Sequence, residues 1–233
     1  MKRIVTVLLI LTLIFSTTVV FGATDDITTK DYALHGSNKI KLKDIYVTVP
    51  FDLSKVKVER IEKGNSLRVE IRDKNTGELL EAYGEKVEPL TNNVETKNFV
   101  SLQNSGVYTT HTIYKERVDG AAVSRLYTVL TIYTYGSFRQ IDKVNYTYWV
   151  EASSGPWELR DKYAVTISRT GSFPTTAIET SGTATIVVTT NTTITGSFSI
   201  EYLKSIGFTI SYVQNNVYYL RKNISLTYVY SVY

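Results

Sequence analysis

The chain has 233 residues, of which 26 are Lys or Arg, 22 are Asp or Glu and none is Cys. The absence of cysteine excludes a disulfide framework, thiol catalysis and any metal site built on thiolates. The formal net charge of +4 is too small to indicate a nucleic-acid partner.

The first 23 residues are typical of a secretory signal peptide. A basic start is followed by an apolar run over residues 4–15 and by small or polar residues up to Ala23. Residues 16–18 are Ser-Thr-Thr, which leaves the apolar run too short for a membrane span. We expect cleavage after Gly22 or Ala23 and an extracellular product. The Lys-, Asn- and Ile-rich usage favours a Gram-positive source.

The region after the signal is strongly charged and is expected to form a small β module. Residues 24–100 include 27 charged side chains. We expect an extended leader over residues 24–43, a charged β module over 44–84 and a polar linker over 85–100. Alternating patterns predict four short strands in the module, at residues 44–49, 55–60, 66–72 and 78–83.

Residues 101–233 are expected to form a second unit whose surface is rich in Tyr, Thr and Ser. From residue 127 onward there are 13 of the 18 tyrosines but only 14 charged residues. Strands separated by turn residues are predicted at 107–116, 123–135, 138–150, 157–169, 208–213, 217–221 and 224–232. The prediction is therefore an all-β chain, with an antiparallel β-sandwich preceded by the small β module.

The stretch from Ser181 to Ile200 holds no charged residue and alternates throughout. Its even positions include Ile186, Val188, Ile194 and Phe198, which are expected to be buried, and its odd positions include Thr185, Thr189, Thr193 and Ser197, which are expected to face water. The apolar residues stay on even positions along the whole stretch. We therefore expect one long bent strand or a hairpin with an odd-numbered loop near Asn191.

One short helix is predicted over residues 200–206. Ser199 is the expected N-cap, Leu203 and Ile206 are the expected inward residues, and Gly207 ends the helix. A hairpin turn is expected at Asn215-Asn216.

No motif in the chain indicates catalysis. The histidines are His35, in the leader, and His111, on the apolar face of a strand, and neither has metal-ligand spacing. We assign no catalytic residue, no metal ligand and no cofactor, although a Ser-His-Asp type of site around His111 stays open because its members need not be adjacent in sequence.

Two tryptophans flank the turn at residues 153–156. Trp149 and Trp157, with Tyr146 and Tyr148, are predicted to form a stacking platform for a sugar ring. The competing interpretation is that both tryptophans fill the end of the sandwich.

These features predict a secreted, non-enzymatic β protein that acts by adhesion or by binding an extracellular ligand, with carbohydrate as one candidate ligand. A second hypothesis comes from residues 183–200. Their Ser/Thr-rich, charge-poor composition is similar to that of the membrane-inserting strands of aerolysin-like pore-forming toxins, without a motif match elsewhere in the chain. Only that hypothesis implies a membrane partner. An extracellular hydrolase is the third possibility.

Overall fold

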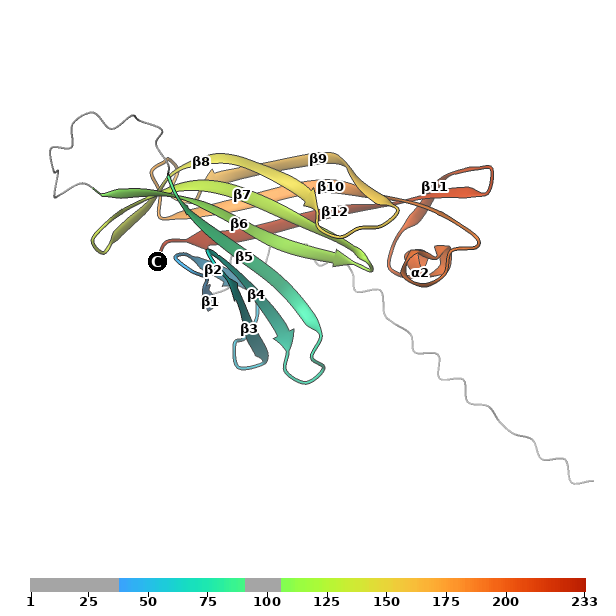
Figure 1. Ribbon diagram of the computed structural model, residues 1–233, viewed down its shortest axis with the longest axis horizontal. Helices are drawn as coiled ribbons and strands as arrows, with labels where there is room; N and C mark the ends of the chain where they lie inside the picture. The colour runs from blue at the N-terminus through green and yellow to red at the C-terminus, as the bar shows by residue number, and fades with distance from the viewer. Residues whose placement is uncertain (1–37, 91–105) are drawn as a thin grey trace, which may run out of the picture.

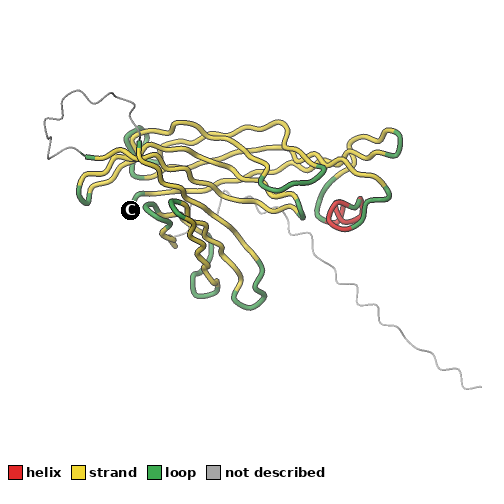
Figure 2. Tube along the Cα trace, viewed as in Figure 1, coloured by secondary structure: helices red, strands yellow, loops and turns green. Residues whose placement is uncertain are grey.

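The computed structural model describes residues 38–90 and 106–233. The expected signal peptide, most of the expected leader and most of the expected linker lie outside these residues. Twelve strands dominate the described chain and form two antiparallel sheets. The long strands after residue 106 make an elongated body, and the strands before residue 90 project from its side (Figures 1 and 2). The predicted all-β, sandwich-like fold is confirmed.

The two sheets have six strands each. The first has the order β1-β2-β12-β10-β9, with β11 added beside β12. Its strands are β1 (Asn38–Lys41), β2 (Tyr46–Val49), β9 (Trp157–Ser168), β10 (Ala177–Asn191), β11 (Thr209–Gln214) and β12 (Val217–Ser231). The second runs in chain order from β3 to β8. Its strands are β3 (Val56–Lys63), β4 (Ser66–Asp73), β5 (Leu79–Pro89), β6 (Val107–Asp119), β7 (Ala122–Tyr135) and β8 (Phe138–Glu151).

The N-terminal strands do not form a sheet of their own. β5 pairs with β6 from Ala82 to Pro89, so β3–β5 extend the sheet made by β6–β8. β2 pairs with the last residues of β12, so β1 and β2 extend the other sheet. The strands of the expected module at 44–84 lie close to the predicted places, and their pairing continues both sheets.

The core lies between the inward faces of both sheets. Alternation along β10 and β12 buries Ile186, Val188, Tyr228 and Tyr230 against the inward residues of β6 and β7. At the centre, the hydroxyl of Thr128 lies 2.9–3.1 Å from three other hydroxyls. These belong to Thr166, Thr180 and Tyr228. This core is therefore apolar with one internally paired hydroxyl cluster.

The central stretch follows neither predicted form. β10 ends at Asn191, the chain then leaves the sheet, and Gly196–Phe198 form a short 3-10 helix, η1. Ile186 and Val188 are buried as expected, but Thr185, which was expected to face water, is buried too and shares a hydrogen bond with Asn223 across the strand pair. The alternation continues past Asn191 without forming strand, because β12 has no residues left to pair with it.

The predicted helix and hairpin turn are confirmed. Helix α2 (Ile200–Ser205) begins at Ser199, whose hydroxyl accepts a hydrogen bond from the Tyr202 amide, and it buries Leu203. Asn215 and Asn216 both adopt positive φ, as a two-residue hairpin turn requires. None of the helices formed by the described residues has the length and apolarity needed to cross a membrane.

Candidate functional site: a polar pocket at the end of the sandwich

The four residues predicted to form a sugar platform do not share one surface. Trp149 is 5 % exposed, points into the sandwich and donates a hydrogen bond from Nε1 to the Tyr163 carbonyl at 3.0 Å. Tyr146 and Tyr148 point to the opposite face of β8 and are 58 % and 37 % exposed. Trp157 is partly buried against the core. The tryptophans therefore fill the sandwich, and only the two tyrosines present open rings.

Those two tyrosines end a row of aromatic rings on the outer face of the second sheet. Tyr114, Tyr127, Tyr148 and Tyr146 follow one another across β6, β7 and β8, with ring centroids 5.0, 5.3 and 5.7 Å apart. We call these four residues the tyrosine row. Tyr127 and Tyr148 are stacked, with 11° between their ring planes, and Tyr146 is the most exposed ring of the row at 58 %.

A charged cluster supports one end of the tyrosine row. Arg68 donates two hydrogen bonds to Glu116, at 2.6 and 2.7 Å, and Arg125 donates a third from Nε at 2.8 Å. Arg125 also lies over the ring of Tyr114, 4.7 Å from its centroid. Burial alone would raise the pKa of Glu116, but the hydrogen bonds and positive charges of the two arginines lower it below its ordinary value. Arg68 also donates from Nε to Glu70 at 3.0 Å, so two carboxylates face the two arginines in this cluster.

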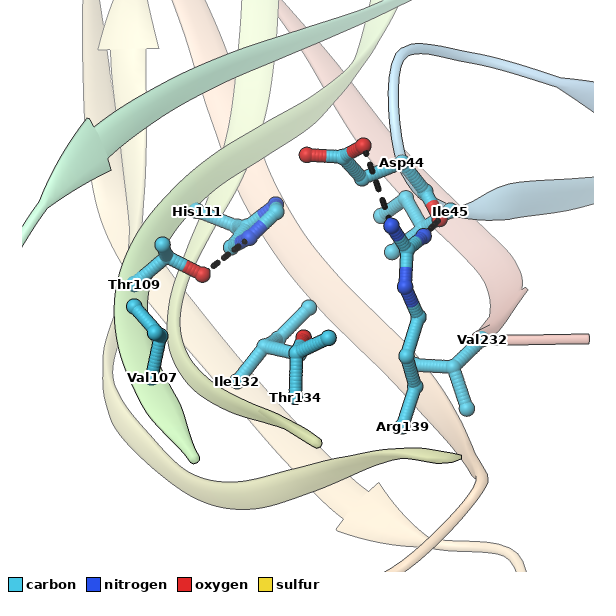
Figure 3. A pocket seen from close by; sticks show the side chains of 9 residues that line it. All are labelled: Asp44, Ile45, Val107, Thr109, His111, Ile132, Thr134, Arg139 and Val232. Carbon is cyan, nitrogen blue, oxygen red and sulfur yellow. Dashed lines mark hydrogen bonds and ion pairs between the residues drawn. The ribbon is translucent and has the colours of Figure 1, made fainter. Parts of the chain in front are cut away.

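The cavity with convergent polar groups lies at the end of the sandwich that holds the C-terminus (Figures 1 and 3). Its volume is about 210 Å³. Its lining comes from the loop before β2, from β6, β7 and β8, and from the residue after β12: Asp44, Ile45, Val107, Thr109, His111, Ile132, Thr134, Arg139 and Val232. We call this cavity the end pocket. Both sheets contribute to it, so it exists only when the sandwich is assembled.

One wall of the end pocket is a chain of hydrogen bonds through His111. The Nδ1 atom of His111 lies 2.7 Å from Glu85 Oε1, and its Nε2 atom lies 2.8 Å from the hydroxyl of Thr109. The other oxygen of Glu85 accepts the backbone amides of Lys43 and Asp44, at 2.7 and 3.0 Å. In the neutral imidazole with its proton on Nδ1, Nδ1 donates to Glu85 and Nε2 accepts from the Thr109 hydroxyl. Glu85 and His111 are both 1 % exposed, so this chain is rigid.

The opposite wall carries a partly open ion pair. Figure 3 shows Arg139 across the pocket from His111, with its guanidinium directed at Asp44. Arg139 donates to the Asp44 carbonyl at 2.6 Å, and its other terminal nitrogen lies 3.4 Å from Asp44 Oδ1. Both side chains keep about a third of their surface exposed. Spare donors of Arg139 and spare acceptors of Asp44 are therefore available to a ligand.

Asp44, Glu85 and His111 also bring one ligand atom each to within 4.8 Å of one another. The two Glu85 oxygens and both His111 nitrogens already hold hydrogen-bond partners, and the Arg139 cation lies beside Asp44. Binding a cation there would require breaking those bonds next to a positive charge. These three residues therefore do not offer a set of free metal ligands in this structure.

Sequence reasoning singled out His111 and missed its partners. Glu85 is 26 residues before it, and Arg139 reaches a residue 95 positions away. One signal in the sequence could have found them. Glu85 shares the inward face of β5 with Tyr83, and a buried carboxylate is costly unless a hydrogen-bond donor or a cation pairs with it.

Comparisons with protein-family models, with curated proteins and with solved structures gave no match to this chain.

Proposed function

We propose that this is an exported, non-enzymatic binding protein that holds a small, hydroxyl-rich ligand, such as a terminal sugar residue, in the end pocket. The observation that carries the proposal is the convergence of Asp44, Arg139, Thr109 and Thr134 on one cavity with an apolar wall. Export rests on the signal-like first 23 residues alone.

The chemistry of the pocket suits such a ligand. Each sugar hydroxyl both donates and accepts a hydrogen bond, and the pocket offers an acceptor in Asp44, a donor in Arg139 and a group that does both in Thr134. Ile132 and Val232 supply apolar surface for the C–H face of a ring. The volume of about 210 Å³ is below the roughly 300–1,000 Å³ of pockets that hold drug-sized ligands, which limits the occupant to about one ring.

Binding can be tested by calorimetry with a panel of monosaccharides and short glycans. We expect one or a few sugars to bind, and Arg139→Gln and Thr134→Val each to weaken binding about tenfold or more, since each removes hydrogen bonds to the ligand. The matched control is Lys143→Gln on the same strand as Arg139, exposed and outside the pocket lining, which should leave affinity unchanged. Equal effects of the control and the pocket variants, or no binding by any sugar, would contradict the proposal.

A second candidate function is hydrolysis, and one observation favours it. In the chain Glu85–His111–Thr109 a hydroxyl, a base and an orienting carboxylate follow one another at 2.7–2.8 Å, which is the connectivity of an activated nucleophile. The test is turnover of nitrophenyl esters by the wild type and by Thr109→Val. Turnover by the wild type that Thr109→Val loses would favour hydrolysis. If the wild type shows no turnover, ligand binding remains as the single candidate function.

We do not adopt the pore-forming hypothesis. It requires β10 to leave its sheet, yet β10 pairs with β12 along its whole length from Ala177 to Asn191, and with β9 on its other edge. Ile186 and Val188 would lose complete burial in that step. A protein that released fluorescent dye from liposomes would restore the hypothesis.

A further inference from the structure

The end of the body opposite the end pocket carries an exposed hairpin (Figure 1). It consists of β11, the Asn215-Asn216 turn and residues 217–221 of β12, and we call it the hairpin tip. All six residues of β11 are exposed. Among them, Ile210 is 41 %, Tyr212 55 % and Val213 47 % exposed, and Tyr202 of the adjacent α2 is 39 % exposed. This projecting end thus carries four exposed apolar or aromatic side chains, while others, such as Tyr163 and Ile167 of β9, are exposed elsewhere.

In α2 and the hairpin tip, the exposed Glu201 is the one acidic side chain, against the basic Lys204 and Arg221. No Asp or Glu occurs from residue 202 to the C-terminus, whereas Lys204, Arg221 and Lys222 do. Lys222 is held by Asp119 at 2.8 Å. Lys204 and Arg221 are exposed, and neither takes part in an ion pair between described residues. Two free cations beside exposed tyrosines and aliphatic side chains complement an anionic, partly apolar partner.

We propose that the hairpin tip docks this protein onto an anionic lipid surface at the depth of the headgroups. Tyrosine rings prefer the membrane–water interface, because one end of the ring is apolar and the other is polar. Each Lys or Arg close to an anionic leaflet adds further attraction. Deeper insertion is excluded, because the outer edge of β11 has unpaired backbone groups that need water.

The geometry favours a lipid surface over a second copy of the chain. Another β11 edge could pair only with a regular strand, but the register of β11 shifts between Ile210 and Tyr212. A bulge of this kind twists an edge strand away from further pairing. The inference is independent of the ligand in the end pocket.

The absence of cysteine makes a direct test possible, because an introduced cysteine is the sole labelling site in the chain. We would label Val213→Cys with an environment-sensitive dye and add vesicles containing phosphatidylglycerol. We expect a blue shift at position 213 and none at Asn75→Cys, an exposed residue in the β4–β5 turn. Equal shifts at both positions would overturn the proposal, because adsorption would then involve another part of the chain, such as the apolar residues 4–15. No shift at 213 would also overturn it.

Two sets of substitutions separate the apolar and the electrostatic contributions. In cosedimentation, the double variant Ile210→Ser with Val213→Ser should weaken vesicle binding about tenfold. Each side chain is about half exposed, so the two together would contribute to binding about as much apolar area as one fully buried aliphatic side chain. Lys204→Gln with Arg221→Gln should weaken it roughly 30-fold on anionic vesicles and leave weak binding to phosphatidylcholine vesicles unchanged. A dye shift with dextran sulfate equal to that with vesicles, or a shift caused by protein concentration alone, would overturn the lipid assignment.

Discussion

Replacing Asp119 by Asn should destabilise the sandwich at the place where its two sheets are tied by charge. Asp119 ends β6 in one sheet, and its carboxylate binds Lys222 of β12 in the other sheet at 2.8 Å. It also accepts two hydrogen bonds from Arg117, at 2.8 and 3.2 Å. Its side chain is 2 % exposed, and those of Arg117 and Lys222 are 24 % and 21 % exposed. The variant would leave two poorly solvated cations without their counter-charge.

Removing one partner of a buried ion pair costs about 3–5 kcal/mol. Because the two cations keep some contact with water, we take the lower end, about 3 kcal/mol. For a domain of about 150–250 residues each kcal/mol lowers Tm by about 2–4 °C, so the expected decrease is about 6–12 °C. The measurement is thermal unfolding followed by far-UV circular dichroism at neutral pH.

The pH dependence provides a second signature. Burial would raise the pKa of Asp119, but the hydrogen bond and charge of Arg117, followed by those of Lys222, lower it below its ordinary value of 3.8. A group with a lowered folded pKa stabilises the fold fully above its unfolded pKa and stops doing so as the pH falls through the folded value. The difference in Tm between wild type and Asp119→Asn should thus be constant near neutral pH and shrink below pH 3.8.

The control is Asp161→Asn, an exposed aspartate with φ of 50° that asparagine can adopt, and its effect should stay within about 0.5 kcal/mol. In a Lys222→Gln background, Asp119→Asn should cost less than in the wild type, because part of the interaction is already lost. A Tm of Asp119→Asn within about 2 °C of the wild type, or a cost that does not depend on Lys222, would refute the reasoning.

Three further predictions concern the core and the outer face. Thr128→Val should lower the free energy of unfolding in urea by about 1–3 kcal/mol, because it removes the hydroxyl shared by two buried partners and the half-buried Thr166. Thr183→Val at an exposed site should be nearly neutral, and equal costs would contradict the cluster. Gly84→Ala should cost about 1–3 kcal/mol, since the new Cβ would lie 2.1 Å from the Tyr114 ring, and an unchanged urea midpoint would show that the ring moves freely. Burial raises the pKa of Tyr228, so its stabilising effect is complete below the unfolded pKa of about 10 and is lost as pH rises further; ultraviolet titration should show this phenol ionising only with unfolding, and reversible ionisation in the folded protein would contradict its burial.

Elements whose causes are local could be predicted from the amino-acid sequence. The capping hydroxyl of Ser199, the helical spacing to Leu203 and the two left-handed asparagines act within a few residues, so α2 and the β11–β12 turn could be predicted closely. Alternation likewise identified Ile186 and Val188 as buried. Alternation with a period of two residues indicates which face of a strand is buried, and this inference does not require knowing the neighbouring strand.

Strand partners and the end pocket were decided only by the tertiary structure. Alternation does not say which strand lies alongside, so it could not predict that β5 pairs with β6 in one sheet and β2 with β12 in the other. The same limit hid the pocket, whose polar residues come from separate elements and acquire their roles only through contacts such as Glu85 with His111 and Arg139 with Asp44. Local chemistry sets the conformation of a segment, but a pocket lined by both sheets exists only after long-range pairing has fixed their register.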